Sequence, residues 1–302
     1  MGVQSMVSLF TKHSKLKWMI AIALSFTTQI CCEEEGLPLF YWQERWGGRD
    51  FVNFGDYISL KLVERIVDSK VRTYTKGKVF KEPKLLASGS IISFAADGDV
   101  IWGSAINGKL LHEKYYKFKD VNIRSVRGPL TRAFLKEHLN KDCPEIYGDP
   151  ALLIPYFFPE FKKPENPVYD YIIIPHYSEE HLFLKTEWDN VVYSTDPWDE
   201  VISKIVQSRF VISSSLHGVI IAEAYGIPAR LLKSTNNEPL FKYQDYYLGT
   251  NRSNFCYATT VDEALEMGGE PPFECDLEKL YQAFPFEFWP SAKFTIPKLQ
   301  TN

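Results

Sequence analysis

Strand-like and helix-like runs alternate along the chain from residue 37 onward, and this alternation limits the possible folds more than any other feature. Short apolar runs typical of strands lie within residues 37–43, 84–92, 99–108, 121–139, 169–178, 190–196, 209–215 and 227–233. Helical runs, with apolar side chains three and four positions apart, lie within residues 51–69, 121–139, 197–208 and 216–226. Strands that alternate with helices imply crossover connections and parallel sheets. We therefore predict an α/β fold with two doubly wound domains in tandem.

A proline-rich stretch at residues 148–167 interrupts the alternation and ends in charged and polar residues, which is typical of a linker. The predicted N-terminal domain covers residues 37–160, and the C-terminal domain, with a C-terminal tail, covers residues 161–302. Ligands of open parallel sheets bind outside the carboxyl ends of the strands. The predicted site is therefore a cleft between the two domains.

The N-terminal segment has the charge pattern of a targeting sequence. Three lysines precede an apolar stretch at residues 18–32, and three glutamates follow it. This pattern predicts a signal peptide or membrane anchor over residues 1–36, membrane association through residues 18–32, and a membrane-associated or secretory location. The alternative is the N-terminal helix of a cytoplasmic protein.

Composition and motifs exclude several classes of partner. The net charge is −4 and no basic block is present, so we expect no nucleic-acid partner. The five cysteines include no C-x-x-C pair, and no dinucleotide or Walker phosphate loop is present. Asp and His clusters at metal-ligand spacing are also missing. We expect neither a cofactor nor a metal.

The most informative stretch is "SSSLHG", which follows an apolar strand and opens a helix. Backbone N–H groups at a helix start favour an anion such as phosphate or carboxylate. Serine hydroxyls add donors, and a histidine in the first turn can donate or accept a proton near neutral pH. The predicted residues here are Ser213, Ser214, Ser215, His217 and Gly218.

Further candidates lie at other strand ends and helix starts. A guanidinium binds carboxylate or phosphate in a bidentate manner, which makes Arg127 a candidate and Arg132 a second one. Asn53 and Asp56 open the first helix, where one of them suffices as a cap. The remaining candidates are Gly89 and Ser90 in a tight turn, His176 at a strand end, and Lys242 and Asp245 in a late loop at residues 241–249.

Taken together, these segments resemble the polysaccharide pyruvyl transferase family, and most closely its bacterial exopolysaccharide branch. The matching segments, in order, are "NFGD", "GSI", "WGSA", "VRGPLTR", "GDPALLIP", "IPHY", "SSSLHGVIIAEAYGIP" and "FKYQDYYLG", within residues 38–255. Ala105 departs from the pattern, since glycine is more usual there. The apolar N-terminal segment is not typical of the bacterial cytosolic members.

The resemblance implies a GT-B-like pair of Rossmann-type domains and the transfer of pyruvate from phosphoenolpyruvate to two sugar hydroxyls, giving a cyclic ketal and phosphate. On this hypothesis His217 is the general acid or the phosphate partner, and Arg127 holds the donor's carboxylate or phosphate. Asp56 is the base or an acceptor ligand, and His176 is a second acid or base. The helix start, Arg132, Gly89 and Ser90 bind the donor; Asn53, Lys242 and Asp245 bind the glycan or lipid-linked acceptor.

Two other functions fit the same sequence. A nucleotide-sugar glycosyltransferase with the same two-domain plan would need an acidic residue near a second-domain helix, and Glu223 is the candidate. A non-catalytic glycan-binding protein is the other alternative, although the presence of Arg127 and His217 favours an enzyme.

Overall fold

The computed structural model describes residues 36–46, 49–75 and 82–299, and Gly36–Asn302 forms one compact unit by its internal contacts. The predicted targeting segment lies outside the described residues, except for Gly36. No helix within the described ranges is long and apolar enough to cross a bilayer.

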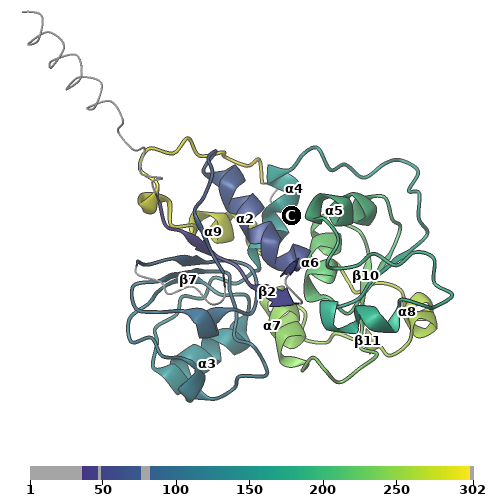
Figure 1. Ribbon diagram of the computed structural model, residues 1–302, viewed down its shortest axis with the longest axis horizontal. Coiled ribbons are helices and arrows are strands. Elements are labelled where there is room, and N and C mark those ends of the chain that lie inside the picture. Colours follow the sequence, from purple (N-terminus) through teal and green to yellow (C-terminus); the bar gives the residue numbers. More distant parts are fainter. Residues whose placement is uncertain (1–35, 47–48, 76–81, 300–302) are drawn as a thin grey trace, which may run out of the picture. The chain divides into compact units, whose positions relative to one another are not determined.

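Two parallel sheets organise the described part of the chain (Figure 1). The first has the order β4-β1-β5-β6-β7, with strands Thr73–Tyr74, Leu39–Phe40, Leu85–Leu86, Val100–Trp102 and Asn122–Ser125. The second has the order β11-β10-β9-β8, with strands Tyr257–Ala258, Ala229–Leu232, Val211–Ser213 and Ile172–Ile174. An antiparallel hairpin, β2 (Gln43–Trp46) and β3 (Arg49–Val52), follows β1.

Helices connect and cover these strands. The α-helices are α2 (Phe54–Ile66), α3 (Pro129–Leu139), α4 (Ile154–Phe157), α5 (Trp198–Val206), α6 (Leu216–Ala224), α7 (Phe241–Gly249), α8 (Val261–Met267) and α9 (Leu277–Gln282). The crossovers after β5 and β6 carry only 3-10 turns, Ile92–Phe94 and Glu113–Tyr115. The α/β class with parallel sheets is confirmed. The finer prediction, two Rossmann-like domains divided at residue 160 in a GT-B arrangement, stays a prediction.

The central strands of both sheets are buried on both faces, because their alternate residues enter different cores. In β6, Val100 and Trp102 pack into a large central core, whereas Ile101 packs into a second core with α3. In β9, Val211 belongs to the central core and Ile212 to a third core that includes α8. The central core therefore contains residues from both sheets.

The proline-rich stretch at residues 148–167 is only partly a linker, which corrects the prediction. Its first half forms a 3-10 helix, η3 (Pro150–Leu153), followed by α4, and their apolar side chains are buried in the central core. Asp149 caps η3 by accepting from the Ala151 amide. The pattern of prolines suggested a break, but the apolar residues between them give this segment a buried face.

The C-terminal segment returns to the first sheet. The Trp102 indole donates to the Leu280 carbonyl oxygen at 2.8 Å, and its ring meets Phe284 edge-on at 5.0 Å. The Thr295 amide also donates to the Ile66 carbonyl oxygen, at the end of α2, at 2.9 Å. The C-terminal tail thus packs against residues of the predicted N-terminal domain.

Two further predictions differ from the structure. Residues 190–196 form no named strand, and only Val191 makes an isolated bridge, to Ile173. The late loop at residues 241–249 is the helix α7.

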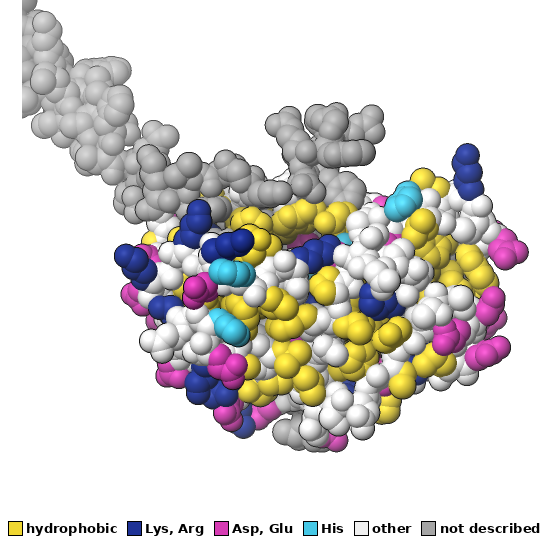
Figure 2. Space-filling model, turned by 90° about the horizontal axis from the view of Figure 1, so that it is seen from below, with side chains coloured by type: hydrophobic (Ala, Val, Ile, Leu, Met, Phe, Trp, Pro, Cys, Tyr) yellow, Lys and Arg dark blue, Asp and Glu magenta, His cyan; other side chains and the backbone are white. Residues whose placement is uncertain are grey.

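On the face in Figure 2, hydrophobic side chains gather across the middle, and acidic side chains lie mostly at the margins.

Candidate functional site

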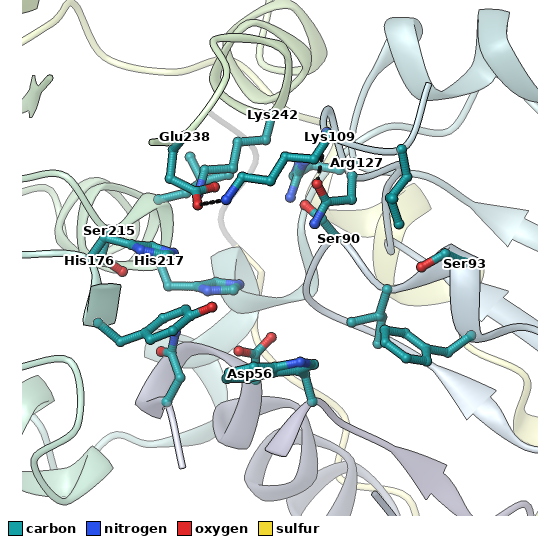
Figure 3. A pocket seen from close by; sticks show the side chains of 18 residues that line it. Asp56, Ser90, Ser93, Lys109, Arg127, His176, Ser215, His217, Glu238 and Lys242 are labelled. Carbon is teal, nitrogen blue, oxygen red and sulfur yellow. Dashed lines mark hydrogen bonds and ion pairs between the residues drawn. The ribbon is translucent and has the colours of Figure 1, made fainter. Parts of the chain in front are cut away.

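A pocket lies at the carboxyl ends of strands from both sheets, where parallel sheets bind their ligands (Figure 3). It has about 200 Å³ of solvent-accessible space. From the first sheet it is lined by Ser90, Lys109 and Arg127, which follow β5, β6 and β7. From the second it is lined by His176, Ser215 and Glu238, which follow β8, β9 and β10. The N-termini of α2, α6 and α7 supply Asn53, Asp56, His217 and Lys242, and Ser93 and Asn107 also line the pocket.

The start of α2 places a buried carboxyl group in the pocket. Asn53 caps the helix by accepting from the Gly55 amide at 3.0 Å, so Asp56 is free for another role. Burial raises the pKa of Asp56 to about 7, and Asp149 adds to the rise while Lys242 opposes it. Gly89 has a φ of +108°, and a Cβ at that position would lie 2.9 Å from Asp56 Oδ1. Gly89 does not line the pocket, and its lack of a side chain gives the Asp56 carboxyl group space.

The start of α6 brings one serine and one histidine into the pocket. Ser215 and His217 line it, and Ser215 makes no side-chain capping bond to the helix. Ser213 Oγ lies 2.7 Å from the Ile174 carbonyl oxygen, and Ser214 Oγ accepts from the His176 amide at 2.8 Å. These two serines hold the turn together.

Ser213, Ser214 and Gly218 do not line the pocket, contrary to the sequence prediction. A Cβ on Gly218 would lie 2.3 Å from Ser213 Oγ and 3.3 Å from Ile174 Cβ. The glycine is needed because α6 begins in close contact with β8 and β9. Tight packing therefore explains these three small residues.

His217 is buried and uncharged at neutral pH. Its Nε2 atom has no hydrogen-bond partner among the described residues and lies 3.8 Å from Asp149 Oδ2. Burial lowers the pKa of His217 to about 4, although Asp149 opposes the shift. Gly55 permits the ring to approach α2, because a Cβ there would lie 2.1 Å from His217 Nδ1.

Arg127 supplies a buried cation with unused donors. Its side chain is 1% exposed, and neither Nε nor Nη2 has a hydrogen-bond partner within the described part of the chain. Asp245 Oδ2 lies 3.7 Å from Nε, which is too long for a hydrogen bond but partly balances the charge. Burial lowers the pKa of Arg127, yet a guanidinium stays protonated in proteins. The free donors can therefore bind a ligand anion.

Asp245 lies behind the pocket instead of lining it, contrary to the predicted contact with an acceptor. It is fully buried in α7 and accepts from the Thr131 amide at 2.9 Å and from the Thr131 hydroxyl at 2.7 Å. Asp245 thus holds the start of α3 in place and partly balances the charge of Arg127.

Two lysines and a glutamate form a charged group on another side of the pocket (Figure 3). Glu238 accepts from Lys242 at 2.7 Å and from Lys109 at 2.5 Å. Burial alone would raise the pKa of Glu238, but Lys242 and the other cations lower it to about 2. The pocket therefore contains Arg127 and two lysines against one fully ionised carboxylate and Asp56.

His176 lines the pocket, while Arg132 does not. Burial lowers the pKa of His176 to about 3, and its Nδ1 lies 2.8 Å from Ser178 Oγ. Arg132 donates to the Cys143 carbonyl oxygen at 2.9 Å and pairs with Glu145 at 2.8 Å. Arg132 is thus engaged outside the pocket, and its role in donor binding stays a prediction.

The sequence prediction omitted several residues that line or support the pocket. Lys109 and Glu238 stand in turns that resemble solvated surface, and Asp149 resembles an ordinary cap before a proline. The aromatic residues Trp42, Phe94 and Tyr177 also line the pocket. No sequence motif pointed to them as site residues.

Glu223, on which the glycosyltransferase alternative depends, is engaged elsewhere. It binds Arg252 through two bonds of 2.7 and 2.8 Å and accepts from the Tyr246 hydroxyl at 2.6 Å. In the part of the chain that is described, no three His, Cys, Asp or Glu side chains are grouped to hold a metal.

Comparisons with known proteins agree with the resemblance. The family model described as polysaccharide pyruvyl transferase matches residues 48–236. An uncharacterised protein of Acanthamoeba polyphaga mimivirus is 31% identical over 230 residues, which cover 72% of this chain and 78% of that protein. The succinoglycan biosynthesis protein ExoV of Rhizobium meliloti (strain 1021) is 28% identical over 220 residues, 68% of this chain and 63% of ExoV. A solved structure of an uncharacterised Klebsiella pneumoniae protein covers 82% of this chain and 98% of its own, at 16% identity and a TM-score of 0.46.

Proposed function

The chain belongs to the polysaccharide pyruvyl transferase family, and we propose that it transfers pyruvate from phosphoenolpyruvate to two hydroxyls of a sugar. The products are a cyclic ketal and phosphate. The observation that carries the proposal is the buried Arg127, whose Nε and Nη2 have no partner among the described residues, in a pocket that also contains two lysines.

The charges of the pocket suit a donor with two anionic groups. Phosphoenolpyruvate carries a carboxylate and a phosphate close together, so it needs two sets of cationic or N–H donors. Arg127 offers a bidentate donor to one of them. Lys109, Lys242 and the N-terminus of α6 offer donors to the other. Arg127 and Lys242 are buried, so their charges act with little screening by water, whereas Lys109 is about half exposed.

The protonation states support a division of labour between Asp56 and His217. With a pKa of about 7, Asp56 holds a proton in a large fraction of molecules at neutral pH and can give it to the methylene carbon of the donor. With a pKa of about 4, His217 is a neutral imidazole and can accept a proton from a sugar hydroxyl. This favours a base role for His217 over the acid role that the sequence suggested.

The reaction balances with these two groups. Protonation turns the methylene into a methyl group and leaves a positive centre on the adjacent carbon, to which the first sugar oxygen bonds. The second sugar oxygen bonds to the same carbon as the carbon–oxygen bond to phosphate breaks, and phosphate leaves with the electron pair. Of the two protons lost by the hydroxyls, one restores the acid and the other leaves on phosphate.

The acceptor side of the pocket has the chemistry of a sugar site. Trp42 and Tyr177 lie with ring centroids 5.1 Å apart, and Phe94 lines the same pocket. Aromatic faces pack against the apolar face of a sugar ring, while Asn53 can bond to its hydroxyls. The acceptor is a polysaccharide or glycan precursor, either free or lipid-linked. As the co-substrate supplies the transferred group, we propose that no further cofactor takes part.

The experiment that tests the proposal measures phosphate release from phosphoenolpyruvate by the protein, with and without a panel of hexosides, followed by the mass of the product. We expect acceptor-dependent phosphate and a product that has gained a pyruvyl ketal. His217→Ala should abolish turnover while the protein still melts cooperatively. If the panel lacks the correct acceptor, no phosphate is released, and calorimetry then measures whether the protein still binds phosphoenolpyruvate. Folded protein that neither binds the donor nor releases phosphate would contradict the proposal, as would an active His217→Ala enzyme.

A further inference from the structure

Asp149 is a buried carboxylate that faces His217 but does not line the pocket. Its Oδ1 atom accepts from the Ser88 hydroxyl at 2.5 Å and from the Ala151 amide at 3.0 Å. Its Oδ2 atom has no partner in the described structure and lies 3.8 Å from His217 Nε2, which is also buried and unpartnered. Capping of η3 therefore uses one oxygen of Asp149 and leaves the other directed at the histidine.

This arrangement has a consequence for the imidazole. A neutral histidine carries its proton on one nitrogen and a lone pair on the other, and the neighbours decide which. The Asp149 oxygen can only accept a hydrogen bond, so it favours the proton on Nε2. The lone pair is then on Nδ1, on the side of Gly55 and the start of α2. The 3.8 Å separation suits a pair that tightens when the ring gains charge, as catalytic contacts do once substrate is bound.

We propose that Asp149 is the positioning residue of His217: it holds the ring proton on Nε2 and so presents Nδ1 as the base. The action of this base on a sugar hydroxyl rests on the proposed function. The position of the ring proton is independent of the proposed function. When Nδ1 takes a proton, the ring becomes cationic and Asp149 stabilises it.

The other charged groups around His217 make such a partner necessary. Arg127 and Lys242 both act to lower the pKa of His217, and Asp149 acts to raise it. His176 also interacts with the ring electrostatically. Asp56 follows Gly55 in the helix start that packs against the ring, but burial keeps a large fraction of this carboxyl group protonated at neutral pH. Without Asp149, the imidazolium would therefore form in a buried site with little compensating negative charge. Removal of the Asp149 charge should therefore lower the pKa of His217 further.

The test compares ring ¹⁵N NMR spectra and pH profiles of the wild-type protein and the Asp149→Asn variant. The asparagine Oδ1 can still accept from Ser88 and Ala151, so η3 keeps its cap. Its amide NH₂ then faces Nε2 and donates, which should move the ring proton to Nδ1. We expect kcat/KM to fall by about 10²- to 10⁴-fold. The acid limb of the kcat/KM profile should move to lower pH. The His217→Gln spectrum assigns the His217 signals among those of the six histidines.

Ser88→Ala is the matched control, because it removes a bond to Asp149 Oδ1 and leaves Oδ2 unchanged. It should keep the proton on Nε2. A wild-type ring with its proton on Nδ1 would overturn the proposal, even if Asp149→Asn failed to fold. A folded Asp149→Asn protein that kept the Nε2 proton would also overturn it. These spectra are recorded without substrate, so they do not depend on whether pyruvyl transfer is the reaction.

Discussion

The pKa values of individual side chains in this protein depend strongly on burial. Asp56 and His217 come close through Gly55, and burial moves their pKa values in opposite directions, to about 7 and about 4. Pairs of titratable groups whose environments separate their pKa values are typical of acid–base sites. Near neutral pH, the carboxyl can give a proton and the imidazole can take one.

Asp56→Asn should change both the pH profile and the stability. In the wild-type protein, kcat/KM should fall above about pH 7, where Asp56 ionises, and below about pH 4, where His217 is protonated. The variant cannot give a proton, so we expect a loss of roughly 10²- to 10⁴-fold. The measurement is the pH dependence of phosphate release. A variant with near wild-type activity would show that Asp56 is not the acid.

The same variant should be more stable than the wild type at high pH. Folding raises the Asp56 pKa from 3.8, so the folded state holds more protons than the unfolded state between about pH 4 and pH 7. Stability contributed by this group therefore falls as the pH rises through that window. Asp56→Asn removes the effect, and its gain over the wild type should be larger at pH 8 than at pH 5 by on the order of 2 kcal/mol. Urea unfolding at both pH values measures it.

The elements of the site are held by close approach between helix starts. The N-terminus of α2 meets α6 at Gly55, and the N-terminus of α6 meets β8 and β9 at Gly218. At both places a side chain would overlap a neighbouring atom. These glycines serve packing between elements, and their effect on function is indirect.

Gly55→Ala should damage the site more than the fold. The new Cβ would lie 2.1 Å from His217 Nδ1, so the ring or α2 must move. We expect kcat/KM to fall at least tenfold, since misplacement of a catalytic group by about 1 Å can cost 10²-fold. Gly226→Ala is the control: its φ is +66° and no atom lies within 4 Å of the new Cβ, so only stability should change. Equal kinetic effects in both variants would contradict the argument.

The whole described unit shares one central core, although the sequence suggested two domains. That core includes Leu39 and Val100 from the first sheet, Val211 and Leu231 from the second, and Trp289 from the C-terminal segment. Because η3 and α4 lie within it, a cut near residue 160 would expose apolar surface on both fragments.

We therefore expect residues 36–302 to unfold in a single transition, and fragments 36–160 and 161–302 to be unfolded when made separately. Circular dichroism and binding of a hydrophobic dye would measure this. The C-terminal fragment would also lack the contacts that Leu280 and Phe284 make with Trp102. Two fragments that each melted cooperatively would support separate domains instead.

Much of this organisation was readable from periodicity and strand-end position. The helices from Asn53, Gly128 and Ser215 begin close to where the sequence places them, because caps, proline and apolar spacing act locally. Position after a strand also placed Asp56, Arg127, His176 and His217 at one edge. Local signals could not separate Ser215, which lines the pocket, from Ser213 and Ser214, which bond to the neighbouring strand and turn.

The sequence alone determined the α/β class, the parallel sheets and the edge at which the pocket forms, since these follow from the order of short-range patterns. Tertiary structure decided which polar groups share that pocket. Lys109 reaches Glu238 across 129 residues of sequence, and Asp149 reaches His217 across 68, so no local pattern could pair them. Tertiary structure also decided the protonation states of the buried groups, because burial shifts a pKa only after distant segments have closed around the group.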